Sequence, residues 1–390
     1  MSRFTIPRDI YFEENALEVL REFEGKKASL IIGGGSVKRN GNLEKIQEHL
    51  AAANIETEVL EGFNTEPTFE MVKQGAKDLE SFQPDWIIGI GGGSAMDSAK
   101  AIWLFYENPD LSFEDAIKPF ELPRLRTKAK FAGIPTTSGS GSEVSNLSVV
   151  ADETTNVKYP LADFELTPDV AIIDPVMIEE LPKHIAAYTG MDAFTHSIES
   201  YVAKPRTLYT DILALGSAEV IKDNLLASYQ GDQEAAKQMH SIQAMAGMAF
   251  ANAVLGNVHS LAHKSGPTFG IPHGYANAIF LPYVIQFNRA VVEDRFAEIA
   301  RRIGLEGKTD AELTDSLVEY IYQLNKDLGL ATTLQDFGVS EEDFNKHLDT
   351  MAKNAMEDPC TGTNPRETSE EQMKELYKAS FYGQEALVKA

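Results

Sequence analysis

The chain has 390 residues, of which 43% are hydrophobic and 24% are charged, a balance typical of soluble globular proteins. This length suggests two domains. A net charge of −24 repels phosphate backbones and anionic headgroups, so nucleic acids and membrane surfaces are not expected partners. A single cysteine, Cys360, excludes an intrachain disulfide, and no apolar run has the length of a signal sequence or membrane span. We therefore expect a cytoplasmic protein.

Short apolar segments alternate with segments of helical periodicity through the N-terminal half. The pattern predicts strands at 28–33, 57–60, 86–90, 131–134 and 170–173, with helices at 42–53, 68–82 and 94–105. Apolar strands separated by helices are typical of βαβ units. We expect an α/β domain in which a parallel sheet carries helices on both faces.

The pattern changes near residue 182, beyond which strand signals nearly disappear. The expected domains are 1–181, which is α/β, and 182–390, which is all-helical. Three capping patterns precede amphipathic runs in the second domain, namely Thr309 with Glu312, Ser340 with Asp343, and Thr368 with Glu371. They support the helical prediction.

Three loops rich in glycine and hydroxyl groups follow predicted strands in the first domain. They are GGGS at 33–36, GGGSAMD at 91–97 and PTTSGSGSE at 135–143. Glycines let the backbone approach an anion, and the N–H groups at a helix start then point toward it. A plain tight turn is the alternative interpretation of any one such loop. Together, at the ends of parallel strands, they favour a nucleotide site.

The first loop also bears on the choice of nucleotide. NAD-binding sheets usually place a carboxylate on the ribose 2′-hydroxyl, whereas this loop continues with Ser36, Lys38 and Arg39. Two cations would attract a 2′-phosphate, so the charges favour NADP(H) over NAD(H). Solvated surface cations with no ligand remain the alternative.

Histidines in the second domain have the spacing of metal ligands. Asp192 and His196 are four residues apart in one predicted helix, as are His259 and His263 in another, and His273 follows on a turn. This mixed oxygen and nitrogen set favours Fe²⁺, Zn²⁺ or a similar divalent ion, and the absence of thiolates argues against a cysteine-type zinc site. A hydrogen-bonded core cluster is the alternative.

The chain resembles the iron-containing (group III) alcohol dehydrogenases over nearly its whole length. The matching segments are GGGSAMDSAK at 91–100, PTTSGSGSE at 135–143, KYPLADFELTPDVAIIDP at 158–175, GMDAFTHSIESYVA at 190–203, GNVHSLAHKSG at 256–266, IPHGYANAI at 271–279 and DPCTGTNPR at 358–366. Within the family, GGGSVKRNG at 33–41 and the opening FTIPRDIYF are most similar to NADPH-dependent butanol dehydrogenases. The resemblance implies a dinucleotide-binding α/β domain, an all-helical metal domain and an active site in the cleft between them.

The resemblance also implies roles for individual residues. Asp192, His196, His259 and His273 match the metal ligands, and His263 matches a histidine that either relays a proton or orients a ligand. Lys38 is a candidate cofactor contact because of its charge. The resemblance implies these further cofactor contacts: Gly34, Gly35, Ser36, Gly92, Gly93, Ser94, Asp97, Thr136, Thr137, Ser140, Ser145 and Lys158. The chain departs from the family at Glu66-Pro67-Thr68, where many members have Asn-Pro-Thr, so no contact is inferred there.

The expected reaction is reversible hydride transfer between NADP(H) and a short-chain primary alcohol or aldehyde, such as butanol or butanal. Alternatives are a glycerol- or propanediol-type polyol dehydrogenase, a dehydroquinate-synthase-like lyase and a non-catalytic NADP-binding module. The lyase would require a Lys- and Arg-rich pocket, whereas only Lys264 lies near the metal motifs. Cys360 is expected either to line the substrate pocket or to be a buried small apolar residue. A homodimer is the default assembly.

Overall fold

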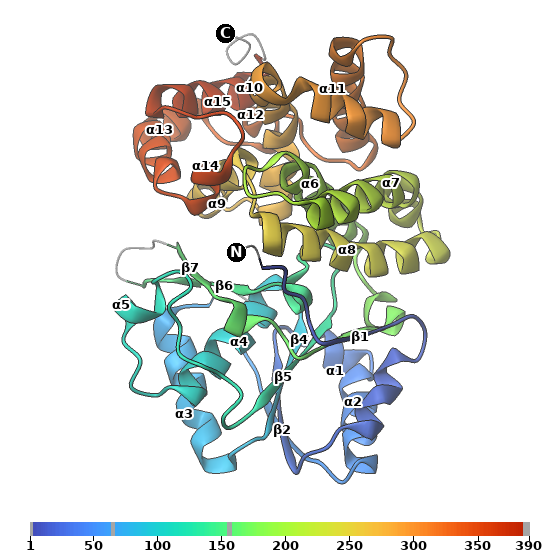
Figure 1. The fold of residues 1–390 in the computed structure, drawn as a ribbon, viewed down its shortest axis with the longest axis vertical. Coiled ribbons are helices and arrows are strands. Elements are labelled where there is room, and N and C mark those ends of the chain that lie inside the picture. The colour runs from blue at the N-terminus through green and yellow to red at the C-terminus, as the bar shows by residue number, and fades with distance from the viewer. Residues whose placement is uncertain (1–2, 64–66, 154–157, 385–390) are drawn as a thin grey trace. The chain divides into compact units, whose positions relative to one another are not determined.

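The computed structural model describes residues 3–63, 67–153 and 158–384, so Glu66 lies outside the described residues. The chain divides into two compact units, Met1–Leu181 and Pro182–Ala390 (Figure 1). The first unit is α/β and the second is helical, as the sequence predicts. Each unit is described separately below.

A six-stranded parallel sheet forms the centre of the first unit. Its order is β1 (Asp9–Phe12), β8 (Val170–Ile173), β5 (Lys130–Pro135), β4 (Trp86–Gly91), β2 (Lys27–Ile32) and β3 (Glu56–Leu60). The five predicted strands are confirmed. The sequence missed β1, since four half-exposed residues carry no periodic pattern. It also missed the antiparallel pair β6 (Leu147–Ala151) and β7 (Lys158–Ala162).

Helices cover both faces of this sheet (Figure 1). On one face, α3 (Phe69–Phe82) and α4 (Gly93–Glu107) pack on Ile31, Ile87 and Phe131. On the other face, the 3₁₀ helix η1 (Ala16–Glu22), α1 (Ser36–Arg39) and α2 (Asn42–Ala52) pack on alternate residues such as Leu30 and Ile88. Strands that are buried on both faces read as continuous apolar runs, which made them predictable.

The remaining elements of the first unit are short. They are α5 (Phe113–Ala116) and the 3₁₀ helices η2 (Ser142–Val144), η3 (Phe164–Leu166) and η4 (Pro175–Ile178). The η2 helix lies within the hydroxyl-rich loop that follows β5, and it packs against β5 and α4. This loop is therefore anchored on the sheet.

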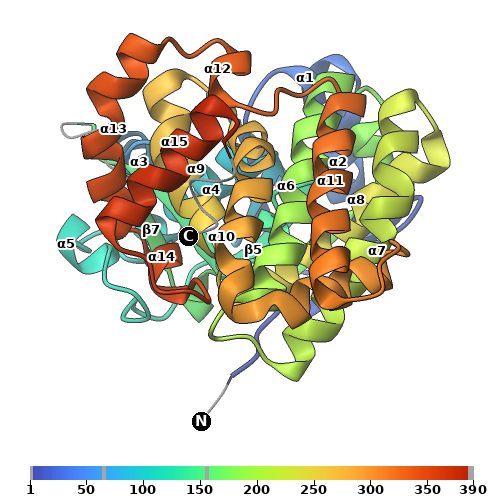
Figure 2. The same ribbon diagram turned by 90° about the horizontal axis from the view of Figure 1, so that it is seen from above.

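The described part of the second unit contains helices and no strands (Figure 2). They are α6 (Lys183–Val202), α7 (Leu208–Gln230), α8 (Gln233–Ala253), α9 (Asn257–Phe269), α10 (His273–Arg302), α11 (Asp310–Asp327), α12 (Leu334–Phe337), α13 (Glu341–Met356), α14 (Pro359–Thr363) and α15 (Glu370–Tyr382). One large apolar core holds them together. Among the described residues, no helix combines the length and apolarity needed to cross a bilayer.

The predicted helix starts are right in two cases and displaced in the third. Thr309 and Ser340 are N-caps, as predicted. The third start is wrong by one residue, because the reciprocal hydrogen bonds join Ser369 and Gln372 rather than Thr368 and Glu371. A serine next to a threonine offers two caps, and the sequence alone does not choose between them.

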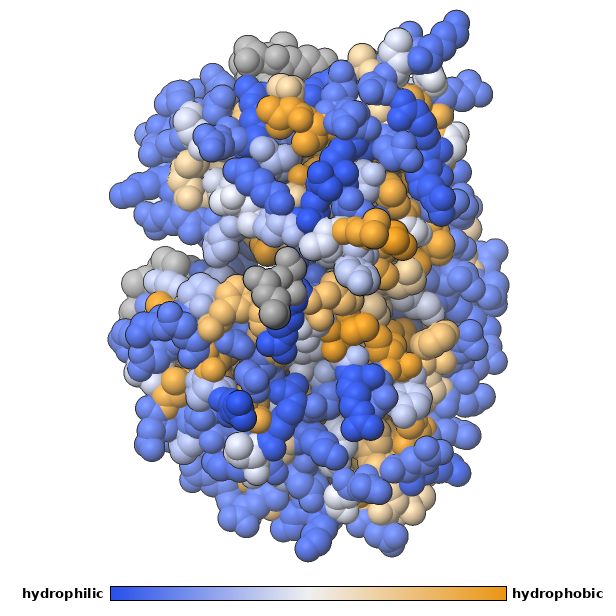
Figure 3. All heavy atoms as spheres, in the orientation of Figure 1, coloured by the Kyte–Doolittle hydropathy of each residue, from blue (hydrophilic) through white to orange (hydrophobic). Residues whose placement is uncertain are grey.

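Figure 3 shows one face of each unit, on which hydrophilic side chains predominate. Exposed large apolar residues are few in the described parts of the chain, and three of them lie together at the start of α7, namely Leu208, Tyr209 and Ile212. Scattered exposed apolar residues are normal for a folded protein.

Candidate metal and cofactor sites

Helix α6 supplies three acidic or imidazole side chains to one buried cluster. Asp192, His196 and Glu199 are separated by four and three residues, so they project from the same face of the helix. All three are buried. Such groups are almost never buried without partners, so the face requires neighbours of complementary chemistry.

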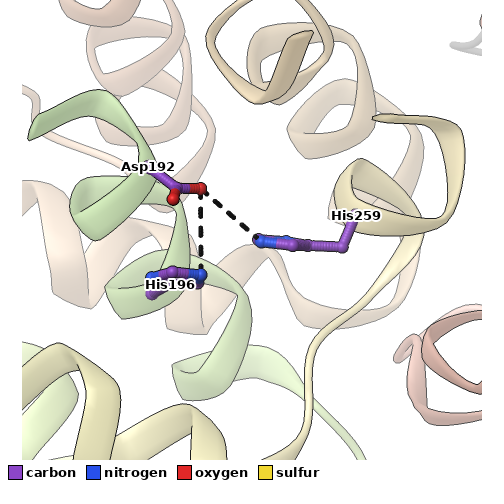
Figure 4. Close-up of side chains that lie close together, drawn as sticks. All are labelled: Asp192, His196 and His259. Atoms are coloured by element: carbon purple, nitrogen blue, oxygen red, sulfur yellow. Dashed lines mark ion pairs between the residues drawn. The ribbon is translucent and has the colours of Figure 1, made fainter. Parts of the chain in front are cut away.

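Two other helices complete the cluster around the Asp192 carboxylate. His259 lies in the first turn of α9, and His273 is the first residue of α10. Asp192 Oδ1 lies 3.8 Å from Nε2 of His196, 3.8 Å from Nε2 of His259 and 3.6 Å from Nε2 of His273. Figure 4 shows the His196 and His259 rings pointing at this oxygen. The structure thus brings Asp192, His196 and His259 into one buried group, with the exposed His273 beside Asp192.

The spacing of these atoms fits a small divalent cation. A tetrahedral ion with bonds of about 2.0–2.2 Å places its ligand atoms roughly 3.4 Å apart, close to the 3.6–3.8 Å between Asp192 Oδ1 and the three histidine nitrogens. Burial raises the pKa of Asp192 to about 7 and lowers the pKa of His259 well below its usual value. A cation would stabilise the carboxylate, while neutral imidazoles keep the lone pairs that bind it. The chemistry and geometry of the donor set therefore agree.

Two further side chains hold the ligands in place. Glu199 Oε2 lies 2.6 Å from His259 Nδ1, and Glu199 Oε1 accepts the Val258 N–H at 2.8 Å. Burial raises the pKa of Glu199 to about 8. Asn277 Nδ2, which can only donate, lies 3.1 Å from His259 Nε2, so Nε2 carries the lone pair and His259 donates from Nδ1 to Glu199. Asn277 Nδ2 donates to Asp192 Oδ1 at 2.7 Å. Sequence reasoning missed Glu199 and Asn277, although each follows a predicted ligand by three or four residues on the same helix.

Backbone contacts bring the three helices close enough for this geometry. A Cβ on Gly274 would lie 2.3 Å from the Tyr188 carbonyl oxygen and 3.0 Å from Asp192 Cβ. Only glycine therefore lets the start of α10 approach α6 and place His273 beside Asp192. Before α9, Val254 has a φ of 59°, which is strained for a β-branched residue. Strain of this kind persists where surrounding contacts fix the backbone.

His263, one turn beyond His259, is tied to a different carboxylate. Its Nδ1 lies 3.0 Å from Asp358 Oδ2, and the same oxygen accepts from Lys264 Nζ at 2.9 Å. Burial opposes ionisation of Asp358, but its interactions with His263 and Lys264 lower its pKa overall, so this carboxylate is ionised. His263 therefore donates from Nδ1, which leaves Nε2 as its other polar atom. The ring stacks on His273, with centroids 5.3 Å apart.

Cys360 lies beside this pair and does not form a second metal site with it. The ligand atoms of His263, Asp358 and Cys360 lie within 4.8 Å of one another. However, the Lys264 ammonium already neutralises Asp358. Burial raises the pKa of the Cys360 thiol, so a thiolate ligand or nucleophile is disfavoured. The structure places Cys360 as a small buried side chain.

Comparison with known proteins identifies the family. Residues 7–175 match the model described as iron-containing alcohol dehydrogenase, and residues 186–381 match its C-terminal counterpart. The chain belongs to the iron-containing alcohol dehydrogenase family. It is 49% identical over 385 residues to the NADPH-dependent butanol dehydrogenase of Clostridium saccharobutylicum, with 99% of each chain covered.

Solved structures agree with the assignment to the iron-containing alcohol dehydrogenases. The iron-containing alcohol dehydrogenase of Thermococcus thioreducens has a TM-score of 0.90 at 34% identity, covering 98% of this chain and 100% of that one. A 1,3-propanediol oxidoreductase has a TM-score of 0.92 at 30% identity, with the same coverage. The resemblance inferred from the motifs, and the expected class of enzyme, are confirmed.

In this iron-containing alcohol dehydrogenase, two of the glycine loops lie at a switch point of the sheet. The chain passes from β2 to β3 on one side and then to β4 on the other, so the strand order reverses between the ends of β2 and β4. Gly33 and Gly91 follow Ile32 and Ile90, which are register partners. Ligands of open α/β sheets bind at such points. This placement agrees with the expected dinucleotide site.

The predicted cofactor residues differ in how accessible they are. The structure places Gly34, Gly35, Ser36 and Ser94 at exposed positions, and Gly92, Gly93, Thr136, Thr137, Ser140 and Lys158 at half-buried ones. Asp97 is bound within the protein, since its two oxygens accept from Ser142 Oγ at 2.8 Å and Val149 N at 3.0 Å. Ser145 is buried, and its hydroxyl lies 3.1 Å from Lys100 Nζ.

Lys100 is a supporting residue that sequence reasoning missed. Its buried ammonium donates to the carbonyl oxygens of Ser145 at 2.8 Å and Leu147 at 3.0 Å. Burial lowers its pKa to about 8, against the attraction of Asp97 and Glu143. It joins the glycine-rich helix α4 to the hydroxyl-rich loop. Its position in the motif GGGSAMDSAK, three residues after Asp97, could have identified it from the sequence.

The structure alters the charge argument for the first loop. Lys38 forms an ion pair with Glu61, the residue that follows β3. The loop sequence offers only cations, but the fold thus brings a carboxylate to it. The Arg39 side chain, by contrast, makes no hydrogen bond or ion pair with any residue that the structure describes, and its Nη1 lies 2.9 Å from the position of a Cβ on Gly35. The two cations are therefore not equivalent.

Proposed function

We propose that this chain catalyses reversible hydride transfer between NADP(H) and a short-chain primary alcohol or its aldehyde, such as butanol and butanal. The observation that carries the proposal is the convergence of three imidazole nitrogens on the buried Asp192 carboxylate. The relative from C. saccharobutylicum, named an NADPH-dependent butanol dehydrogenase, supports the substrate and the cofactor.

Asp192, His196, His259 and His273 would hold one divalent ion. When bound, the ion would act as a Lewis acid on the substrate oxygen, and the nicotinamide would donate or accept the hydride. Iron and zinc both accept this ligand set. The family's description favours Fe²⁺, and Zn²⁺ is the second candidate. Glu199 and Asn277 keep the ligand atoms oriented, so that little rearrangement is needed when the ion binds.

His263 would move the proton that accompanies the hydride. Asp358 fixes its Nδ1–H, so Nε2 is the atom that accepts a proton during alcohol oxidation and returns it during aldehyde reduction. A role that only orients a ligand is less well supported, because the Nδ1 partner of His263 is Asp358 rather than a member of the four-residue ligand set. A carboxylate that fixes the tautomer of a catalytic histidine is a recurring arrangement in enzymes.

The sheet of the first unit would bind the cofactor through its loops. The start of α4 presents backbone N–H groups beside Gly92 and Gly93, which suit a pyrophosphate. The hydroxyl groups of Thr136, Thr137 and Ser140 suit the nicotinamide ribose. Lys158 and the loop 33–38 would complete the contacts, whereas Asp97 and Ser145 would act by fixing these loops.

A polyol dehydrogenase is the second candidate. The neighbour named 1,3-propanediol oxidoreductase, with its TM-score of 0.92, favours it. The lyase and the non-catalytic module have no comparable support. Cytoplasmic location and a homodimer stay predictions; the single cysteine is compatible with a reducing compartment.

The test is initial-rate butanal reduction by enzyme that has been stripped with a chelator and reloaded with Fe²⁺ or Zn²⁺. NADPH and NADH are compared, and 1,3-propanediol oxidation is measured beside butanol oxidation. We expect activity with NADPH only after metal is returned, and butanol to be preferred. Faster turnover of the diol would select the second candidate. No activity with any pair, while metal and cofactor bind, would contradict both.

A further inference from the structure

Glu61 occupies the edge of the sheet where the first glycine loop begins. In the parallel pairing of β2 and β3, Ile31 is opposite Leu60, so the next residues along, Ile32 and Glu61, lie at the same carboxyl edge. The Glu61 side chain is 53% exposed. A carboxylate at the carboxyl edge of a dinucleotide-binding sheet is the usual partner of an NAD ribose 2′-hydroxyl.

Glu61 is also the partner of one of the two cations in that loop. Lys38, in α1, donates to its carboxylate, and the Lys38 side chain is 39% exposed. A pair this exposed contributes little to stability, because water screens it and the side chains lose freedom. The fold therefore does not depend on the pair, and a ligand of higher charge can compete for Lys38.

Arg39 is the second cation of the loop. Its guanidinium folds back over Gly35 and has no acidic partner among the described residues. A planar guanidinium can form two parallel hydrogen bonds with a phosphate, and it stays charged at any relevant pH. A 2′-phosphate would meet Arg39 directly, whereas Lys38 would be shared between the phosphate and Glu61.

We propose that Glu61 is a specificity-determining residue that moderates the preference for NADPH. With NADPH, Glu61 competes with the 2′-phosphate for Lys38 and repels it, while Arg39 provides the main attraction. With NADH, the Glu61 carboxylate accepts a hydrogen bond from the free 2′-hydroxyl. The loop therefore admits both cofactors. This inference rests on the proposed function, since it requires the adenine ribose to bind at this loop.

The experiment measures dissociation constants for NADPH and NADH from the fluorescence of the bound nicotinamide, without turnover. For Glu61→Gln we expect NADPH to bind about 3- to 10-fold more tightly, since one repulsive charge is removed and Lys38 is released. NADH should bind about 3-fold more weakly. Arg39→Gln should weaken NADPH by about 10-fold or more and leave NADH nearly unchanged. Glu56→Gln, at the other end of β3 and exposed, is the matched control.

A double-mutant cycle separates competition from simple repulsion. If Glu61 acts through Lys38, Glu61→Gln should improve NADPH binding less when Lys38→Gln is already present. An unchanged ratio of the NADPH and NADH constants in Glu61→Gln would overturn the inference while leaving the proposed function intact. A wild-type protein that binds neither cofactor would overturn both. A folded-state check by thermal melting accompanies each variant.

Discussion

The two candidate sites are built in opposite ways. In the second unit, three of the four candidate metal ligands are buried and only His273 is exposed, and Glu199 and Asn277 hold ligand atoms through further hydrogen bonds. In the first unit, all the predicted cofactor residues except Ser145 are exposed or half-buried, and several of them are glycines or lie at the start of α4. One site depends on side-chain identity and the other depends largely on the path of the backbone.

This difference follows from what each site has to bind. A small ion of high charge needs ligand atoms within a few tenths of an ångström of ideal positions, which only buried and fixed side chains provide. A dinucleotide is long and spreads its contacts over several loops, so each contact contributes less. Truncating a side chain should therefore cost far more in the metal site than in the cofactor loops.

The largest effect is expected from His259→Ala. The change removes one ligand and leaves Glu199 without its ring partner, so the variant should bind almost no metal after dialysis against Fe²⁺ or Zn²⁺. Butanal reduction should fall by about 10³-fold, which corresponds to several kcal/mol of lost charge stabilisation. His184→Ala, an exposed histidine outside the cluster, is the control. Retained turnover in metal-depleted His259→Ala would remove the basis for the metal site.

The next largest effect is expected from Asp358→Asn. An amide facing His263 Nδ1 can donate, which would leave the proton on Nε2 and block its role as acceptor. We expect kcat to fall by about 10²-fold, with metal content and the dissociation constant for NADPH unchanged. The fold should persist, because the Asn oxygen can still accept the Cys360 N–H that caps α14.

His263→Ala serves as the reference for Asp358→Asn. If the aspartate acts only through the histidine, the double variant should be no slower than His263→Ala alone. A fall in metal content in Asp358→Asn would instead show that the carboxylate supports the ligands. Normal kcat in this variant, together with a severe loss in His263→Ala, would separate the two residues.

A smaller effect is expected from Glu199→Gln, which leaves all four ligands present. The glutamine can satisfy Val258 N–H or His259 Nδ1–H with its oxygen, but its amide then faces the other donor. We expect metal affinity to fall about 10- to 100-fold, measured by competition with a chelator. Glu180→Gln, an exposed carboxylate just before α6, is the control. Unchanged affinity would mean that His259 keeps its orientation without Glu199.

Sequence patterns predicted the parts of the molecule that depend on local chemistry. The apolar runs of the parallel sheet, and the four-residue spacings of Asp192 with His196 and of His259 with His263, were visible because burial on both faces and helical periodicity leave regular traces. The strands β1, β6 and β7 were missed because short strands that are not buried on both faces leave no continuous apolar run.

Contacts between distant segments could not be predicted in the same way. Glu199 was visible as the next residue on the face of α6, but its bond to His259 depends on how α6 and α9 pack. Asp358 lies 95 residues from His263, and Glu61 lies 23 residues from Lys38. Such pairs are set by tertiary packing. The preference for NADP(H) was therefore inferred from the cations of the first loop without Glu61, which the fold places beside them.

The smallest effect is expected in the cofactor loops, from Ser94→Ala. Ser94 is exposed in the first turn of α4, where its backbone N–H is the group that suits a pyrophosphate. Losing the hydroxyl should raise the dissociation constant for NADPH only about 2- to 5-fold, the size of one ordinary hydrogen bond. Ser94→Pro lacks the hydroxyl and also the N–H, yet proline is tolerated in a first helical turn.

The proline variant should therefore bind NADPH at least about 5-fold more weakly than the alanine variant, provided that both melt as cooperatively as the wild type. Equal losses in the two variants would mean that the hydroxyl, and not the backbone, makes the contact. Binding in the cofactor loops would then depend on side chains, as it does in the metal site. That result would contradict the distinction drawn between the two sites.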